Sequence, residues 1–171
     1  MTFIHKKKKY YMLENFKFQF LALDIDGVLT DGGMYYTEGG DEFKKFNAKD
    51  GLAIKALTDM GKYVGFISSG INGKIIEKRA ELLGVQKVYI GTWKKAEVLE
   101  QWCKELNIDL ENVAYIGDDV NDIPAIQKAG LSACPADAVP LVKEAVNIVL
   151  SEKGGEGCVR EFVEKYIMEI R

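Results

Sequence analysis

The sequence has almost no histidine: the single one among its 171 residues is His5. Catalytic triads built on imidazole and zinc sites with histidine ligands are therefore excluded for the rest of the chain. The three cysteines, Cys103, Cys134 and Cys158, form no Cys-x-x-Cys unit. This pattern gives no zinc signature and favours a reducing, cytoplasmic compartment. Any chemistry must come from carboxylates, hydroxyls, lysines and backbone groups.

Long apolar runs and a surplus of positive charge are also lacking. No apolar stretch approaches the roughly 20 residues that span a bilayer. The lysine-rich run Lys6–Lys9 is not followed by an apolar segment, so it does not read as a secretory signal. The formal net charge of −3 argues against a dedicated nucleic-acid binder. We expect neither membrane nor nucleic acid as a partner, a solvated tail over residues 1–17, and one domain over residues 18–171.

The chain does contain apolar strands that alternate with helices. Strands are expected at 18–23, 63–67, 86–90, 113–116, 132–134 and near 148. Helices are expected at 50–60, 72–83, 94–106, 123–129, 139–145 and 158–170, the first of them capped by Asp50. This alternation predicts an α/β fold with a Rossmann-like, doubly wound parallel sheet that holds its ligand at the carboxyl ends of the strands. Segments 34–37 and 42–46 flank a Gly-Gly turn and predict a β-hairpin flap.

The most informative feature is the pair Asp24 and Asp26 at the end of the first apolar strand. Residues i and i+2 of a strand point to the same side, so both carboxylates can face one small volume. A cation between them, or a division of labour between nucleophile and acid, relieves their repulsion. The ordinary alternative is a pair of aspartates that starts a turn.

A second acidic segment, Gly117-Asp118-Asp119 with Asp122, follows the fourth expected strand. Gly117 permits close backbone approach, and the combined carboxylates call for a hard divalent cation. With few carboxylates and a phosphate to complete an octahedron, Mg²⁺ suits the site better than Ca²⁺. Taken alone, the Gly-Asp-Asp unit is also typical of a turn.

Between the acidic segments lie a hydroxyl signal, Ser68 and Ser69 before Gly70, and a lysine signal that includes Lys95. Phosphoryl transfer needs mainly positioning and cationic or hydrogen-bond stabilisation of equatorial oxygens. Singly, such serines usually bond the next helix and such lysines are usually exposed. Their order and their placement after strands favour a phosphate site.

In this order, Asp-x-Asp-Gly-Val-Leu-Thr-Asp, Ser-Gly, Lys and Gly-Asp-Asp-x-x-Asp resemble the motifs of the haloacid dehalogenase superfamily. The chain resembles in particular its capless family of 3-deoxy-D-manno-octulosonate 8-phosphate phosphatases, from Phe18 to the C-terminus. This resemblance implies a Mg²⁺-dependent phosphomonoesterase with no cap domain. It also implies a phosphorylated keto-sugar acid of lipopolysaccharide biosynthesis as substrate, and a cytoplasmic homotetramer.

The resemblance also implies roles for individual residues. Asp24 would attack phosphorus and form an aspartyl-phosphate, and Asp26 would protonate the leaving alkoxide and later activate water. Asp24, Asp118 and the Asp26 backbone carbonyl would hold Mg²⁺, Lys95 would neutralise the phosphate, and Ser69 (or Ser68) would bind it. The supporting residues would be Gly117, Asp119 and Asp122, and the substrate-binding residues Thr30, Asp50, Gly70 and Arg79.

The sequence departs from the family at Ile71, where many relatives have Arg or Glu directly after Thr-Gly. The choice between an eight-carbon and a nine-carbon keto-sugar acid, of the KDN or sialic acid type, therefore stays open. Arg79 is retained and could meet a substrate carboxylate bidentately.

Assembly is expected through the hairpin, whose apolar residues Tyr35, Phe43 and Phe46 suit burial against a neighbour. An intramolecular packing face is the alternative. The Gly154–Gly157 segment is expected to be flexible and to extend toward a neighbouring subunit, or to be merely a linker.

Two further function classes compete with the phosphatase. A phospho-accepting receiver domain uses a similar acidic cluster with Mg²⁺ but lacks an acid two residues after the accepting aspartate, so Asp26 argues against it. A non-catalytic assembly domain could keep the fold, although all four motifs are intact here.

Overall fold

The computed structural model describes residues 16–70, 73–92 and 94–168. A six-stranded parallel sheet with the order β5-β4-β1-β6-β7-β8 forms its centre. The predicted α/β fold class is confirmed. The predictions for His5 and for the lysine run of the tail lie outside the described residues.

The sheet strands follow the predicted positions, with ends that differ by one or two residues. They are β1 (Phe20–Leu23), β4 (Tyr63–Ser68), β5 (Lys87–Ile90), β6 (Val113–Ile116), β7 (Leu131–Cys134) and β8 (Ile148–Val149). The helices are α2 (Ala48–Asp59), α3 (Lys74–Leu83), α4 (Lys95–Leu106), α5 (Ile123–Ile126), α6 (Pro140–Ala145) and α7 (Cys158–Phe162). Short helical turns that the sequence pattern did not predict are η1 (Leu110–Asn112) and η2 (Val120–Asp122). Within the expected C-terminal helix, α7 is followed by the π-helical turn η3 (Val163–Ile167).

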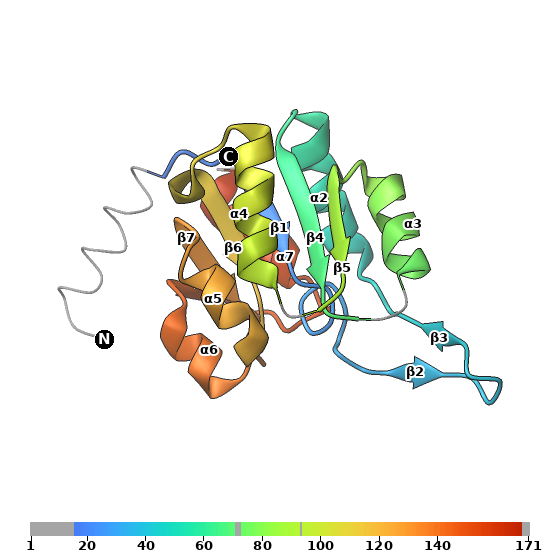
Figure 1. Ribbon diagram of the computed structural model, residues 1–171. Helices are drawn as coiled ribbons and strands as arrows, with labels where there is room; N and C mark the ends of the chain where they lie inside the picture. The colour runs from blue at the N-terminus through green and yellow to red at the C-terminus, as the bar shows by residue number, and fades with distance from the viewer. Residues whose placement is uncertain (1–15, 71–72, 93, 169–171) are drawn as a thin grey trace.

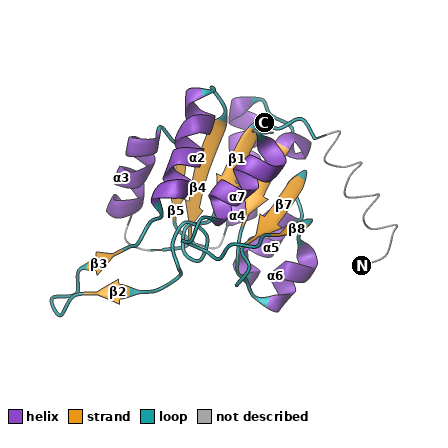
Figure 2. Cartoon of the chain, turned by 180° about the vertical axis from the view of Figure 1, so that it is seen from behind, coloured by secondary structure: helices purple, strands orange, loops and turns teal. Residues whose placement is uncertain are grey.

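The sheet is covered on both faces, which explains why its strands are continuous apolar runs. Helices α4, α5 and α6 pack on one face (Figure 1), and α2, α3 and α7 pack on the other (Figure 2). The longer helices α2, α3 and α4 bury side chains three and four positions apart, such as Leu99, Trp102 and Cys103 on α4. None of the described helices has the length and apolarity that crossing a bilayer requires.

The strand order reverses beside β1. From β1 the chain steps to β4 and β5 on one side, and then returns to β6 on the other side of β1. The loops after β1 and β6 therefore leave the sheet in opposite directions, and a crevice forms at their carboxyl ends. Asp24 directly follows β1, and Asp118 lies two residues after β6.

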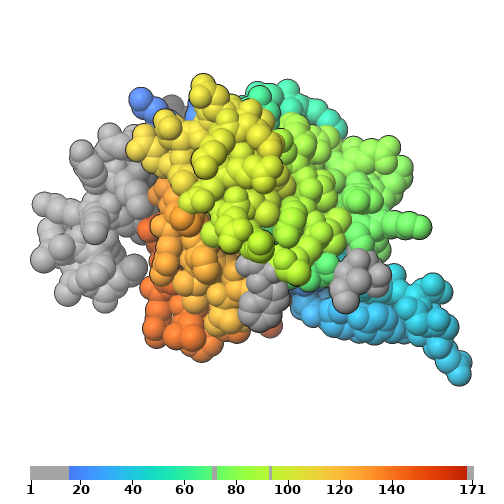
Figure 3. Space-filling view, viewed as in Figure 1, coloured from blue at the N-terminus to red at the C-terminus, as the bar shows by residue number. Residues whose placement is uncertain are grey.

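The predicted hairpin is present but shorter than expected. Strand β2 (Tyr35–Tyr36) pairs antiparallel with β3 (Glu42–Phe43). The hairpin lies beside the carboxyl ends of the strands (Figure 1) and projects from the body of the molecule (Figure 3). No other insertion separates the elements of the described ranges, which agrees with the predicted absence of a cap domain.

Three predictions about helix ends were wrong, one of them for α5, which ends at Ile126 rather than at residue 129. Asp50 does not cap α2: the N-cap is Asn47, whose side chain accepts a hydrogen bond from the Lys49 backbone N–H. Asp50 lies instead in the first turn of the helix and is buried. The expected long C-terminal helix changes after Phe162 into the π-helical turn η3, and Met168 is already extended.

The Gly154–Gly157 segment contacts its own chain. The Gly155 N–H donates to the Val28 carbonyl (2.9 Å), and the Asn47 side-chain amide donates to the Gly155 carbonyl (3.1 Å). These bonds tie the segment to the loop after β1 and to the start of α2, so it packs against that loop.

Candidate active site

Asp24 is fixed at the end of β1 by a backbone hydrogen bond to the neighbouring strand β6. The Asp24 N–H donates to the Ile116 carbonyl of β6 (3.0 Å), which extends the β1–β6 ladder by one bond. The chain then turns at Gly27 with φ +86°, and a Cβ atom built there would lie 2.0 Å from Asp118 Oδ2. Only glycine allows this conformation and this close approach.

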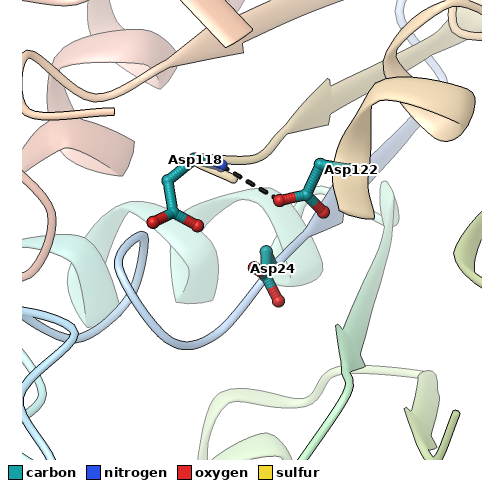
Figure 4. A group of neighbouring side chains, drawn as sticks. All are labelled: Asp24, Asp118 and Asp122. Atoms are coloured by element: carbon teal, nitrogen blue, oxygen red, sulfur yellow. Dashed lines mark hydrogen bonds between the residues drawn. The ribbon is translucent and has the colours of Figure 1, made fainter. Parts of the chain in front are cut away.

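Three carboxylates meet at this point (Figure 4). Asp24, Asp118 and Asp122 each offer an oxygen within 4.8 Å of the others. Burial, followed by the negative charge of Asp122, raises the pKa of Asp24 well above its ordinary value. The same two causes raise the pKa of Asp118 to about 7. The cluster therefore carries more negative charge than its surroundings compensate.

Lys95, at the start of α4, supplies a positive charge to the cluster. Its Nζ lies 2.9 Å from Asp24 Oδ1 and 2.7 Å from Asp122 Oδ1, and the residue is 1% exposed. Burial alone would lower the pKa of Lys95, but the two carboxylates outweigh it and raise the pKa. Lys95 is thus held as a buried ammonium group against the Asp24 carboxylate.

Asp122 is occupied by donors from the protein. Its Oδ1 accepts from Lys95 Nζ and from the Tyr115 hydroxyl (2.7 Å). Its Oδ2 accepts from the backbone N–H groups of Asp118 (3.1 Å) and Asp119 (3.3 Å). A Cβ at Gly117 would lie 2.4 Å from the Asp122 carboxyl carbon, so glycine makes room for it. These four donors make Asp122 a support for Lys95 rather than a free ligand.

The remaining carboxylates fit a hard cation. Asp118 Oδ1 is buried and has no hydrogen-bond partner among the described residues, a condition that costs free energy unless an ion or water satisfies it. Asp24 faces it with a carboxylate of raised pKa. An all-oxygen donor set with few carboxylates suits Mg²⁺.

A pocket of about 330 Å³ opens over these groups. Its lining consists of Asp24, Asp26, Gly32, Ser69, Gly70, Lys95, Asp118, Asp119 and Asn121. Ser69 lines it, with its hydroxyl accepting a hydrogen bond from the Asn121 amide (3.3 Å). Ser68 is 1% exposed and does not line it, and its hydroxyl accepts the Gly70 N–H (3.1 Å). The geometry therefore favours Ser69 over Ser68 as a phosphate ligand.

A second pocket of about 260 Å³ adjoins the first and shares Asp26, Ser69 and Gly70 with it. Its outer wall belongs to the hairpin and consists of Met34, Tyr36, Glu42 and Lys44. Asp26 thus lies between the pocket that contains Lys95 and a space bounded by the hairpin. A larger hollow of about 530 Å³ at the end of α4 includes none of the predicted site residues.

Three residues predicted to bind substrate lie elsewhere. The Thr30 hydroxyl is buried within the loop after β1, where it accepts the Gly32 N–H (3.2 Å). Arg79 on α3 donates to the Asn47 carbonyl (3.4 Å) and stacks over Phe46. Asp50 accepts the Arg160 N–H of α7 (2.8 Å). None of the three lines either pocket, and Ile71 lies outside the described residues.

Three residues near the site were missed from the sequence: Lys44, Tyr115 and Asn121. A polar aromatic residue in the wholly buried strand β6 is a signal that could have identified Tyr115. Lys44 is two residues after Glu42 and so shares its side of the hairpin. The pattern alone does not say which side faces the site.

Comparisons with known proteins point to one family. A family model described as haloacid dehalogenase-like hydrolase matches residues 74–162. The 3-deoxy-D-manno-octulosonate 8-phosphate phosphatase KdsC of Haemophilus influenzae is 41% identical over 149 residues, which are 87% of this chain and 81% of that protein.

Solved structures are similar over nearly the whole chain. The cobalt-bound deoxy-D-mannose-octulosonate 8-phosphate phosphatase of Haemophilus influenzae has a TM-score of 0.84 and 38% identity, over 91% of this chain and 90% of that one. The 3-deoxy-D-manno-octulosonate 8-phosphate phosphatase of Moraxella catarrhalis, in complex with magnesium, phosphate and KDO, has a TM-score of 0.85. It is 31% identical, over 92% of this chain and 89% of that one. The chain therefore belongs to the haloacid dehalogenase-like hydrolases and, among them, to the family of 3-deoxy-D-manno-octulosonate 8-phosphate phosphatases.

Proposed function

We propose that this protein is a Mg²⁺-dependent phosphatase that hydrolyses the phosphate monoester of a 3-deoxy keto-sugar acid of the 3-deoxy-D-manno-octulosonate 8-phosphate type. The observation that carries the proposal is the meeting of Asp24, Asp118 and Lys95 in one pocket at the switch point of the sheet. The relatives' names support the substrate class.

In the first half of the reaction, an Asp24 oxygen attacks phosphorus and the ester P–O bond breaks. The leaving oxygen takes the proton of Asp26, and an aspartyl-phosphate remains. In the second half, water gives a proton to Asp26 and attacks phosphorus. The bond to Asp24 then breaks, which releases phosphate and restores the carboxylate.

The surrounding groups stabilise the charge of the transferring phosphoryl group. Lys95 holds its ammonium group 2.9 Å from the nucleophile, and the Ser69 hydroxyl is available to an equatorial oxygen. Asp24, Asp118 and the Asp26 carbonyl would hold Mg²⁺, which neutralises phosphate and carboxylate charge when bound.

The test is the variant Asp24→Asn, which keeps the shape of the side chain but removes its nucleophilic charge. We expect turnover of all phosphate esters to fall by several orders of magnitude, with an unchanged circular dichroism spectrum. Asp59→Asn, at the exposed end of α2, is the matched control and should keep wild-type turnover. Near-normal activity of Asp24→Asn would disprove the nucleophile.

The substrate is identified by kcat/KM for a panel of eight-carbon and nine-carbon keto-acid phosphates. A preference for 3-deoxy-D-manno-octulosonate 8-phosphate supports the proposal, and a preference for a nine-carbon 9-phosphate would replace it with the related phosphatase activity. A single stoichiometric phosphorylation without turnover would instead indicate a receiver domain, and inactivity with every ester an assembly domain.

We further propose a cytoplasmic homotetramer in which the hairpins of neighbouring subunits meet. Phe43 is 50% exposed and stacks on Tyr35 with ring centroids 5.4 Å apart, which leaves an apolar surface on the hairpin. Light scattering should give four times the mass of the chain for the wild type and a smaller mass for Phe43→Glu. A monomeric wild type would contradict the assembly.

A further inference from the structure

The second pocket contains a positive charge to which the predicted machinery gives no role. Lys44 directly follows β3, and its side chain is only 4% exposed. Its Nζ lies 2.6 Å from Asp26 Oδ1 and 2.9 Å from a Glu42 carboxylate oxygen. A lysine is rarely buried this deeply unless its charge is paired.

The hairpin geometry explains why Lys44 reaches Asp26. Side chains alternate along a strand, so Glu42 and Lys44 share one side and Phe43 points to the other. The pairing of Tyr36 with Glu42, and of Tyr35 with Phe43, separates a face toward the pocket from an apolar face. The hairpin therefore presents a buried ammonium group to the loop after β1.

Two side chains donate to Asp26 Oδ1, and the contact from Lys44 is the shorter of the two. The Thr30 hydroxyl lies 3.5 Å from the same oxygen, at the limit of a hydrogen bond. Asp26 lines both pockets and is about one-third exposed at its side chain. Without Lys44, this half-buried carboxyl group would be free to rotate toward solvent.

We propose that Lys44 is a positioning residue that holds the Asp26 carboxyl group between the two pockets, at the place where the leaving oxygen departs. The inference rests on the proposed function. As the ester P–O bond breaks and the bond to Asp24 forms, the leaving oxygen takes the Asp26 proton. The carboxylate that remains lies against the Lys44 ammonium group, which stabilises the new negative charge.

This role makes a specific kinetic prediction. Help from a general acid matters most for an ester whose leaving oxygen is a strong base, and matters least when the leaving group departs readily as an anion. The constant kcat/KM covers the steps up to departure of the leaving group, so hydrolysis of the aspartyl-phosphate does not enter it.

The test compares phenyl phosphate, which has a poor leaving group, with p-nitrophenyl phosphate, which has a good one and nearly the same shape. For Lys44→Met we expect kcat/KM to fall about 10-fold for phenyl phosphate and less than about 3-fold for p-nitrophenyl phosphate. Lys44→Gln should give the same pattern and serves if the methionine variant does not fold. Thermal unfolding of each variant monitors the fold.

The matched control is Lys45→Met, which removes the same charge from the next residue of the hairpin. The Lys45 side chain is 59% exposed and pairs with Asp31 at 3.3 Å, away from Asp26. We expect it to keep the wild-type ratio of the two kcat/KM values.

An equal loss with both esters would show that Lys44 acts only on the structure, and no loss with either would show that it does not position Asp26. A changed ratio in Lys45→Met would also overturn the inference. A wild type that turns over neither these esters nor any keto-acid phosphate, or an Asp24→Asn variant that retains turnover, would overturn the proposed function itself. That failure is visible before any Lys44 variant is compared.

Discussion

Lys95 lies between two buried carboxylates, so its removal leaves both without a nearby positive charge. For Lys95→Met, which keeps the length of the side chain, we expect kcat to fall on the order of 10²-fold or more. We also expect the free energy of unfolding without Mg²⁺ to fall by about 3 kcal/mol or more, because breaking a buried pair strands a charge. Both are measured directly, by steady-state kinetics and by urea denaturation.

The neighbouring Lys94 provides the control. Its side chain is 65% exposed and lies 3.8 Å from Glu97, a surface pair of little energetic weight. Lys94→Met should match the wild type in both measurements. If Lys95→Met did so too, the buried ammonium group would have no part in the site.

The positions of Asp24, Asp118 and Lys95 could be predicted because each is defined by the end of a strand or the start of a helix. Parallel strands bring their carboxyl ends to one edge, so local signals far apart in sequence converge there. Lys44 and Asn121 could not be placed in this way. Their contacts depend on how a hairpin and a short helical turn pack against that edge, which no local pattern encodes.

At the scale of the elements, Asp50 on α2 contacts the first turn of α7 and stabilises the start of that helix. Gly157, the N-cap of α7, provides no side-chain acceptor for the helix, and the Asp50 carboxylate accepts the Arg160 N–H instead. Asp50→Ala would leave buried N–H groups at this helix end unsatisfied. We expect the free energy of unfolding to fall by about 1–3 kcal/mol, as measured by urea denaturation.

Asp50→Asn, which keeps an acceptor oxygen, should lose less stability than Asp50→Ala. Asp59→Ala, at the exposed end of the same helix, should lose almost none. Equal stability of Asp50→Ala and the wild type would mean that α7 does not depend on this bond.

Element boundaries show where sequence patterns lose their information. Asp50 is a good N-cap residue by type, but Asn47, three residues earlier, has the extended backbone that a cap requires. Arg79 is half-buried against Phe46 and Asn47, because α3 packs beside the start of α2. In both cases tertiary packing, rather than local preference, decides where the side chain goes.

For the molecule as a whole, the crowded carboxylates link stability to pH and to Mg²⁺. Burial, followed by the negative charge of Asp122, raises the pKa of Asp24 and raises the pKa of Asp118 to about 7, from the ordinary value of 3.8. At a pH between the ordinary pKa of 3.8 and the raised pKa of about 7, the metal-free folded protein binds more protons than the unfolded chain. Its free energy of unfolding should therefore fall as the pH rises from about 4 to 7.

Magnesium should reverse this trend, because its carboxylate ligands must be deprotonated. We expect Mg²⁺ to raise Tm strongly at about pH 8 and weakly at about pH 5, relative to the same protein with a chelator. Differential scanning fluorimetry across this range measures the difference, and Asp118→Asn should lose most of it at every pH. A Mg²⁺-induced shift of Tm that is independent of pH would contradict the view that these buried carboxyl groups form the metal site.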